Sequence, residues 1–415
     1  MTHAELFDHY LATRRLTQEL ASKLSDADAT IQPMPDASPA KWHLGHTTWF
    51  FEAFVLRDLL PGYPLYRLDW PFLFNSYYEA EGPRLLRSRR GMLSRPSLEE
   101  VIAYRRHVDD HLLTRRSELP NAALELIELG IHHEQQHQEL FLADILNAFS
   151  ANPLRPAFAP APNAACLKKD KQPLAWRSFE GGLFHIGHEG PDFGFDAETP
   201  AQQVLLAPYA LASRCVTNGE WEEFIADGGY REPRHWLSDG WSWVNDNAVD
   251  APLYWRERTA QGRLAFTLYG EAVLNPDAPV CHISFYEADA FASWAGARLP
   301  TEHEWERAAS DLDPDHGNQL DHQGAAMPAP ADQSELSQMF GDVWEWTGSA
   351  FRPYPGFRIA PGTVGEYNGK FMSGQFVLKG GSCATPRGHL RASYRNFFYP
   401  HQRWQFCGLR LARDA

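Results

Sequence analysis

The 415-residue sequence has little cysteine, no long apolar run and no block of basic residues. Its five cysteines are scattered and form neither a C-x-x-C pair nor the dense framework of a disulfide-rich secreted domain. No stretch approaches the roughly 18 apolar residues of a membrane-spanning helix. The acidic residues Glu5 and Asp8 do not fit a signal peptide. We therefore expect a cytoplasmic protein without a membrane partner.

The charge balance is acidic. The chain has 38 Lys and Arg against 53 Asp and Glu, which gives a formal net charge of -15. Such a surface repels the phosphates of nucleic acids and anionic lipids, so neither is expected as a partner. A hydrophobic content of 44% is that of an ordinary globular protein. Because the chain is too long for one compact core, two domains are expected.

Four long amphipathic helices are predicted in the first part of the chain. Thr2 and Ser97 each begin a capping box, since a Glu follows three residues later in both cases. Ser38 followed by Pro39 is a typical N-cap and first-turn pair. The expected helices cover residues 3–24, 40–60, 98–119 and 121–150. Together they predict a four-helix bundle over residues 1–150, and the cores of such bundles often hold metal sites.

The last of these helices carries the most informative stretch, IHHEQQHQEL at residues 131–140. At about 100° per residue, His133 and His137 lie only about 40° apart, one turn above the other. Leucines of the same helix share that face, so both imidazoles are expected to point into the bundle. Two neutral imidazoles at this spacing can chelate a first-row transition metal. The alternative is that both are hydrogen-bonded core residues.

A third ligand is expected from the second helix. His46 lies at the centre of its aromatic face, whereas His43 lies about 60° round on the flank. His46 is therefore the natural third ligand, with a histidine packed among aromatic residues as the alternative. Replacing His43, or His132 on the last helix, is expected to have a much milder effect than replacing a ligand.

Residues 133–137 also match the zinc-protease pattern H-E-x-x-H, in which Glu134 would be the general base. The extended metzincin form of that pattern needs Gly and His where Leu140 and Ala143 stand. The pattern alone thus leaves the metal and its chemistry open.

A long segment between the second and third helices carries two adjacent tyrosines, Tyr77 and Tyr78, followed by four arginines at 84–90. Loops of this length without regular structure are usually functional. The phenols could donate protons and the arginines could bind carboxylates. A solvated basic loop is the alternative for any one arginine.

Proline- and alanine-rich composition indicates a linker over residues 151–175. Residues 176–415 then change character, with short runs, many Gly and Trp, and frequent turn dipeptides. Helices are expected at 217–227 and 286–295, and irregular β-structure at 181–187 and 376–382. This is the pattern of an α+β domain.

Four motifs of this second domain, in order, resemble the formylglycine-generating-enzyme fold, a C-type-lectin-like scaffold. They are RLPTEHEWE at 298–306, GDVWEWT at 341–347, KGGS at 379–382 and GLRLA at 408–412. The first domain resembles a DinB-type bundle. Together the two are similar to the iron-dependent, EgtB-type sulfoxide synthases of ergothioneine biosynthesis, and NSYY at 75–78 and YRNFFYP at 394–400 are similar to their type II branch.

This resemblance implies roles for individual residues. His46, His133 and His137 would bind Fe(II). Gln136 and Asn396 would hold hercynine, and Phe397 would face its trimethylammonium group by cation–π attraction. Arg87 and Arg90 would bind the carboxylate of the thiol donor, which would be cysteine or γ-glutamylcysteine. Tyr77 or Tyr78 would supply the proton or electron that favours C–S bond formation over oxidation of the thiol by O2.

Several alternatives share parts of this pattern. An ovothiol-type synthase acting on histidine and a selenium-inserting relative have the same chemistry. A zinc DinB-type thiol S-transferase or a zinc protease would use the histidines without redox chemistry, and a sugar- or protein-binding module would use them only structurally. Two-cysteine copper chemistry, as in formylglycine-generating enzymes, is not expected. Only Cys383 lies near the KGGS motif, and the next cysteine, Cys407, lies in a different motif. Cys383 is expected to be a small buried residue.

Overall fold

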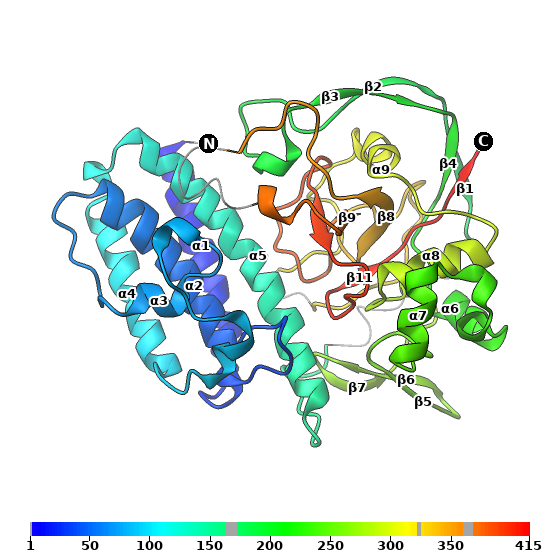
Figure 1. The fold of residues 1–415 in the computed structure, drawn as a ribbon, viewed down its shortest axis with the longest axis horizontal. Coiled ribbons are helices and arrows are strands. Elements are labelled where there is room, and N and C mark those ends of the chain that lie inside the picture. Colours follow the sequence, from blue (N-terminus) through cyan, green and yellow to red (C-terminus); the bar gives the residue numbers. More distant parts are fainter. Residues whose placement is uncertain (1, 163–171, 322–324, 360–367) are drawn as a thin grey trace. The chain divides into compact units, whose positions relative to one another are not determined.

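The computed structural model describes residues 2–162, 172–321, 325–359 and 368–415. The chain forms two compact units, each described by itself below (Figure 1). The first unit contains Met1–Ala159 with the short segment Pro191–Phe193, and the second contains Pro160–Gly190, Gly194–Ile359 and Asn368–Ala415. Residues 163–171, the middle of the predicted linker at 151–175, lie outside the described residues.

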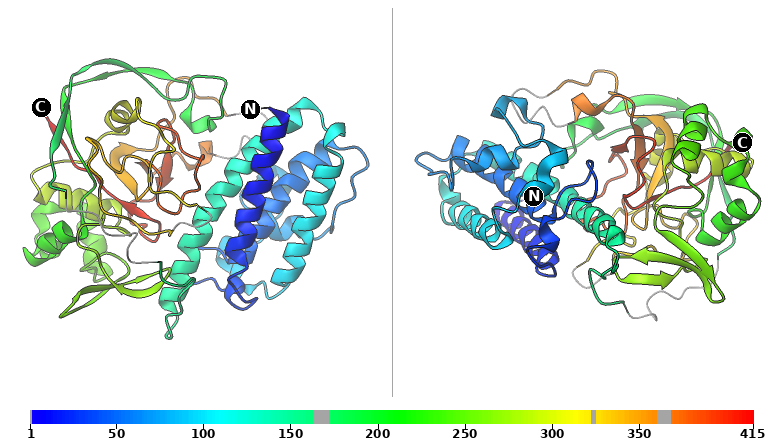
Figure 2. Two further views of the ribbon diagram at one scale, coloured as in Figure 1. Left: turned by 180° about the vertical axis from the view of Figure 1, so that it is seen from behind. Right: turned by 60° about the horizontal axis from the view of Figure 1, so that its bottom comes forward.

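The first unit is a helical bundle, as predicted. Its helices are α1 (His3–Ala21), α2 (Ala40–Phe51), α3 (Trp70–Phe74), α4 (Leu98–Thr114) and α5 (Asn121–Ala151). Helix α2 packs against α4 and α5, and α5 also packs against α1, so the four long helices lie side by side (Figure 2). All residues of α2 are buried. This helix is therefore the centre of the bundle rather than a surface helix with one apolar stripe.

Both predicted capping boxes form. The backbone N–H of Glu5 donates to the Thr2 hydroxyl, and that of Glu100 donates to the Ser97 hydroxyl. Because these bonds satisfy backbone groups that the first turn of a helix leaves unpaired, they fix where α1 and α4 begin.

The second helix differs from the prediction at both ends. Pro39 rather than Ser38 occupies the N-cap, with no side-chain cap. The regular helix ends at Phe51 and continues as the π-helix η2 (Glu52–Arg57). In this wider turn the buried Glu52 carboxylate accepts hydrogen bonds from the Tyr104 and Tyr63 hydroxyls. The sequence pattern did not reveal this departure, since every residue of the turn is compatible with an α-helix.

The second unit mixes strands and helices, which confirms the α+β class. Its strands are β1 (Trp176–Phe179), β2 (Gly182–Ile186), β3 (Gln202–Leu206), β4 (Tyr209–Ala212), β5 (Trp255–Thr259), β6 (Gly262–Thr267), β7 (Gly270–Val273), β8 (Trp344–Ala350), β9 (Phe376–Lys379), β10 (Asn396–Phe398), β11 (Cys407–Gly408) and β12 (Ala412–Asp414). The helices are α6 (Asn218–Ala226), α7 (Ser238–Asp246), α8 (Phe285–Trp294) and α9 (Glu302–Ala309). Helices α6 and α8 were predicted, whereas α7 and α9 were not.

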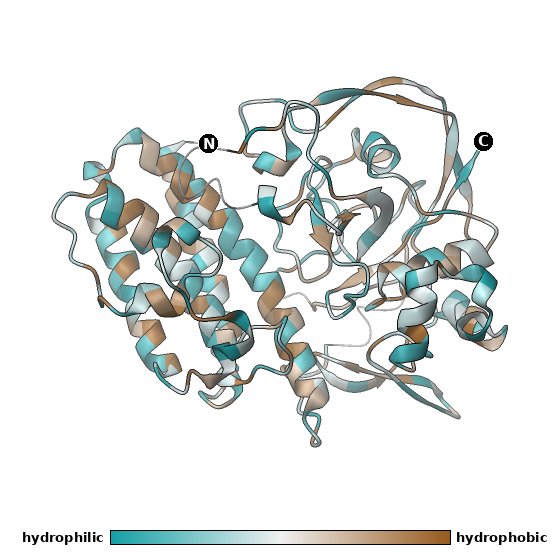
Figure 3. Cartoon of the chain, viewed as in Figure 1, coloured by the Kyte–Doolittle hydropathy of each residue, from teal (hydrophilic) through white to brown (hydrophobic). Residues whose placement is uncertain are grey.

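The strands are distributed over small sheets in the described part of the chain. One sheet has the order β10-β9-β8-β11, and others are β1-β4-β12, β5-β6-β7 and the ribbon β2-β3. The strands are short and the connections between them are long. Hydrophobic residues are scattered along this unit (Figure 3). Its interior contains buried ion pairs as well as apolar side chains.

Three of the four sequence motifs of the second unit meet in one buried cluster around Glu345 on β8. The Arg410 guanidinium donates to the Glu345 carboxylate at 2.8 Å, and the Trp305 indole N–H donates to its other oxygen at 2.8 Å. All three side chains are fully buried. Removing one partner of such a pair would leave an uncompensated charge in the core. These motifs thus specify the fold rather than the chemistry.

Within the residues that the structure describes, no helix has the length and apolar character needed to cross a membrane.

Candidate metal centre

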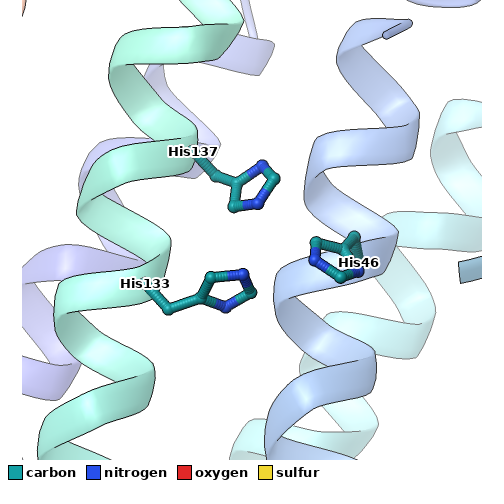
Figure 4. A group of neighbouring side chains, drawn as sticks. All are labelled: His46, His133 and His137. Carbon is teal, nitrogen blue, oxygen red and sulfur yellow. The ribbon is translucent and has the colours of Figure 1, made fainter. Parts of the chain in front are cut away.

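Three histidines meet inside the bundle. His133 and His137 extend from successive turns of α5, and His46 extends from α2 towards them (Figure 4). One nitrogen from each ring lies within 4.8 Å of the other two. Among the described residues, this is the one group of three or more His, Cys, Asp or Glu side chains that could hold a metal ion. The predicted ligands are therefore brought together.

Burial keeps these imidazoles neutral. His46 and His133 are almost fully buried, and His137 is partly buried. Desolvation lowers the pKa of His133 to about 3 and lowers the pKa of His46 and of His137 well below the usual histidine value. A neutral imidazole has a nitrogen lone pair free for a metal, whereas an imidazolium does not. The cluster is thus in its ligating form at neutral pH.

The orientation of His46 is fixed from both sides. Its Nδ1 donates to the backbone carbonyl oxygen of Phe74 at 2.6 Å, which leaves Nε2 as the atom with a lone pair. That Nε2 is buried and has no hydrogen-bond partner among the described residues. A buried polar atom without a partner is costly, and a metal ion would satisfy it. The residues present therefore fit a bound metal.

Gly45 allows the hydrogen bond between His46 and the Phe74 carbonyl to form. A Cβ atom at Gly45 would lie 2.1 Å from Cε1 of Phe74, so any larger residue would push the buried Phe74 ring out of its place.

His43 has a contact that helix geometry alone did not predict. Its Nδ1 lies 2.8 Å from Nδ1 of His137, and its Nε2 lies 3.1 Å from a carboxylate oxygen of Asp144. His43 lies on the flank of α2, and because α5 packs against that flank, its ring contacts His137 and Asp144. Both partners are about a hundred residues away in the chain, so no local pattern in the sequence indicates this contact.

Glu134 does not face the histidine cluster. Its carboxylate accepts from Arg105 at 2.6 Å, from Arg14 at 2.8 Å and from the Thr17 hydroxyl at 2.6 Å, which belong to α4 and α1. Burial would raise the pKa of Glu134, but Arg105, Arg14 and the Thr17 hydrogen bond together lower it to about 2. A carboxylate held in this way is a structural anion. The zinc-protease interpretation, which makes Glu134 a base at the metal, is wrong.

The comparisons with known proteins agree with this architecture. Residues 9–141 match the DinB superfamily, and residues 168–415 match the sulfatase-modifying factor enzyme 1-like domain. Hercynine oxygenase of Mycobacterium tuberculosis is 34% identical over 441 residues, which cover 100% of both chains. The chain belongs to the hercynine oxygenase family. The hercynine oxygenase of Mycolicibacterium smegmatis is also 34% identical, over 99% of both chains.

Part of the chain is also similar to a formylglycine-generating enzyme. That of Thermomonospora curvata is 28% identical over 286 residues, which cover 56% of this chain and 91% of the relative.

In this hercynine oxygenase family member, Cys383 is fully buried, as predicted, and so are Cys215 and Cys407. Burial raises the pKa of Cys407 and of Cys215. These cysteines are thus protonated core thiols.

The two predicted tyrosines differ in exposure. Tyr78 is fully buried, with its ring centroid 5.6 Å from that of Trp49 and 5.3 Å from that of Phe54. Tyr77 is half-buried and stacks on Tyr78 at 4.8 Å. Tyr78 is therefore anchored in the bundle, and Tyr77 lies one ring further out.

The two predicted arginines also differ. Both belong to the 3-10 helix η4 (Arg87–Met92), but Arg87 is exposed and Arg90 is buried. The Arg90 guanidinium donates to the hydroxyls of Ser38 and Ser76 and lies over Trp42, with Cζ 3.3 Å from the ring centroid. Arg90 is thus already part of the bundle, whereas Arg87 is accessible.

The residues predicted to hold hercynine come from both units. Gln136 is half-buried on α5, next to His137. Asn396 and Phe397 are half-buried on β10. The Asn396 carboxamide oxygen accepts from the Phe397 backbone N–H at 2.9 Å, and Phe351 stacks on Phe397 at 4.2 Å. One face of the Phe397 ring is therefore already covered.

Proposed function

We propose that this protein is an Fe(II)-dependent enzyme of ergothioneine biosynthesis that joins the sulfur of a thiol to C2 of the hercynine imidazole, with O2 as oxidant. The observation that carries the proposal is the group of three neutral histidines inside the bundle in a chain that matches hercynine oxygenases over its full length. The thiol donor is cysteine or γ-glutamylcysteine. The product is a sulfoxide.

The proposed reaction balances. One S–H bond of the thiol and the C2–H bond of the imidazole break, and a C–S bond forms. One atom of O2 becomes the sulfoxide oxygen, and the other leaves as water with the two hydrogens. The four electrons that reduce O2 come from the sulfur and from C2.

The histidine cluster supports this chemistry through its donor set. Three imidazoles from two helices would hold the metal through neutral nitrogens, without negative charge from the protein. Bound iron(II) would supply coordination positions for the thiol and O2 and the electron transfer that joins sulfur to carbon. His46 is held by the Phe74 carbonyl so that its Nε2 faces the cluster.

The chain's other residues would bind and protonate the substrates. Arg87, which is exposed, would attract a carboxylate of the thiol donor. Asn396 and Gln136 would donate or accept hydrogen bonds at the hercynine end. Tyr77 or Tyr78 would hold a proton at its phenol oxygen and supply it to the reacting groups, since a positioned phenol can act as a general acid.

Metal loading separates the proposal from the alternatives. The metal-free protein is loaded anaerobically with Fe(II) or with Zn(II), and each form receives hercynine or histidine together with cysteine or γ-glutamylcysteine. O2 uptake and product mass are then measured. We expect one O2 consumed per sulfoxide formed, only with Fe(II), and with hercynine preferred over histidine.

Other outcomes identify the other classes. Thiol transfer by the zinc form without O2 uptake would make the protein a DinB-type transferase, and preference for histidine would make it an ovothiol-type synthase. The His133→Ala variant is the matched control, since it removes one ligand from the same preparation.

A further inference from the structure

A second pair of histidines, His107 and His111, lies on helix α4. The two residues are four positions apart, so their side chains leave the helix only about 40° apart, as those of His133 and His137 do on α5. The ring centroids of His107 and His111 are 4.3 Å apart, against 4.7 Å for His133 and His137. The bundle thus has this two-imidazole arrangement twice, and the histidine cluster accounts for only one of them.

The ring nitrogens of this second pair include atoms that can act as ligands. Nδ1 of His111 lies 2.9 Å from the backbone carbonyl oxygen of His107. Because a carbonyl oxygen only accepts hydrogen bonds, Nδ1 of the neutral ring carries the hydrogen and Nε2 carries the lone pair. Nε2 of His107 is buried and has no hydrogen-bond partner among the described residues. A buried polar atom without a partner is costly, and a metal ion would satisfy it.

A buried negative charge lies beside the pair. The Glu52 side chain of η2 is 1% exposed and accepts hydrogen bonds from two tyrosine hydroxyls, but in the part of the chain that the structure describes no Lys or Arg forms an ion pair with it. Burial and the neighbouring imidazole lower the pKa of His107, whereas Glu52 and Asp110 raise it. Both carboxylates therefore favour positive charge at this ring, and a bound cation would supply the charge that Glu52 lacks.

We propose that His107 and His111 bind a second metal ion through their Nε2 atoms, namely a divalent ion of the late first row such as Zn(II), Ni(II) or Cu(II). Imidazole nitrogens suit these ions, and two imidazoles on successive helical turns form a chelate. Both residues are half-buried, so the ion and the water molecules that complete its coordination can reach the rings from solvent. The ion would join two turns of α4 beside Glu52. This site does not depend on the proposed function, whose ligands lie on α2 and α5.

The full-length variant with His133→Ala and His137→Ala separates the two sites, because it leaves the histidine cluster a single imidazole and does not alter α4. Zn(II) is the probe, and the bound equivalents are counted by equilibrium dialysis of the metal-free protein. We expect this variant to bind one equivalent of Zn(II) and to lose it when His111→Asn is added. His3→Asn in the same background is the matched control, since His3 is an exposed histidine without a partner at this spacing, and it should keep the equivalent. If His111→Asn also keeps it, the inference is wrong.

A second measurement identifies the ligands. In the cluster variant loaded with Cu(II), electron paramagnetic resonance should show nitrogen couplings from two imidazoles, and either His107→Gln or His111→Asn should remove this signature. A purely structural role, in which the imidazoles only pack against Tyr63 and Tyr66, would instead lower the unfolding temperature and leave the bound metal unchanged.

The wild type provides the test if the cluster variant does not fold, as judged by its thermal unfolding. The wild type should then bind one equivalent of Zn(II) more than His111→Asn does, and equal counts would overturn the inference. His111→Asn should change neither the retention of Fe(II) nor sulfoxide formation. A protein that binds the second ion as expected but makes no sulfoxide would therefore contradict the proposed function alone.

Discussion

The indole of Trp42 lies parallel to the imidazole of His46, with ring centroids 4.6 Å apart and planes inclined by 12°. Trp49 stacks on His46 as well, at 5.7 Å and 18°. The Arg90 guanidinium lies over Trp42. His46 is therefore held by stacked rings and by its bond to Phe74, so its orientation exists before any metal binds. Such preorganisation lowers the cost of binding, because no side chain has to be ordered.

The ligand assignment predicts a contrast between neighbouring histidines. His133→Ala should abolish retention of Fe(II), because two imidazoles remain where three are needed. His132→Ala should retain the metal, because His132 is rotated about 100° from His133 on α5. Metal content after anaerobic loading and desalting is the measurement. Equal loss of iron in both variants would contradict the assignment.

Buried Glu134 predicts a specific loss of stability. Glu134→Gln leaves Arg14 and Arg105 buried with less than their full compensation, so the free energy of unfolding should fall by about 3–5 kcal/mol. Urea unfolding at neutral pH measures this. Glu125→Gln, an exposed substitution on the same helix, is the control and should change little. A large loss of turnover in Glu134→Gln without any loss of stability would instead indicate a chemical role.

The lowered pKa of Glu134 also predicts how the stability of the protein depends on pH. The pKa of Glu134 is about 2 in the folded protein and about 4.3 in an unfolded chain. The folded state thus binds fewer protons in this window, and the stability contributed by the ionised carboxylate is present above pH ~4.3 and disappears towards pH ~2. The difference in unfolding free energy between wild type and Glu134→Gln should therefore shrink over that range.

The arginine assignment separates two neighbours in η4. Arg87→Ala should fold normally and raise the KM for the thiol donor, since an exposed guanidinium is lost. Arg90→Ala should lower the unfolding temperature, because Ser38 and Ser76 lose their donor and Trp42 loses its cation. Arg89→Ala, another exposed arginine of the same turn, is the control. An unchanged KM for the thiol donor in Arg87→Ala would exclude Arg87 from its binding.

Sequence reasoning predicted the shared face of His133 and His137 because that signal is local. The i, i+4 spacing of His133 and His137 fixes their common face without any knowledge of the fold, and the capping boxes at Thr2 and Ser97 are equally local. What it missed depends on contacts between helices. His43 contacts Asp144 and His137 only because α5 brings them to its flank.

Two further differences have distinct causes. Helix α9 was missed although Thr301 and Glu304 form a capping box, because the stretch is short and rich in charged residues. Ser38 was expected to cap α2 with its side chain, but its backbone N–H donates to Asp144 and its hydroxyl accepts from Arg90. Both partners are distant in the sequence, so no local pattern could have revealed them.

The hercynine assignment predicts an effect on one substrate only. Phe397→Leu removes an aromatic face that a trimethylammonium group could use, which is worth about 0.5–2 kcal/mol, or about 2- to 30-fold in KM for hercynine. Metal content and the KM for the thiol donor should not change. Because Phe351 covers one face of Phe397, Phe351→Leu is the informative companion and should lower stability more than it raises the hercynine KM. If neither variant alters the hercynine KM, another aromatic group binds the cation.

The last prediction concerns which product forms. A thiol and O2 brought together at one metal can also give a sulfinic acid, and a three-histidine site does not prevent this by itself. A phenol that supplies a proton early would favour the sulfoxide. Tyr78 is buried against Trp49, which stacks on His46, and Tyr77 stacks on Tyr78.

Tyr77→Phe, Tyr78→Phe and the double variant remove only hydroxyl groups, so the stacked rings and the KM values should be kept within a few-fold. We expect the ratio of sulfoxide to sulfinic acid to fall in at least one single variant and in the double variant, as measured by mass spectrometry of the products. Tyr63→Phe is the matched control, since it removes a hydroxyl that donates to Glu52 and should leave the ratio unchanged. A double variant with the normal ratio and rate would assign the proton to a different residue, because then neither phenol of this loop takes part in the choice between the two products.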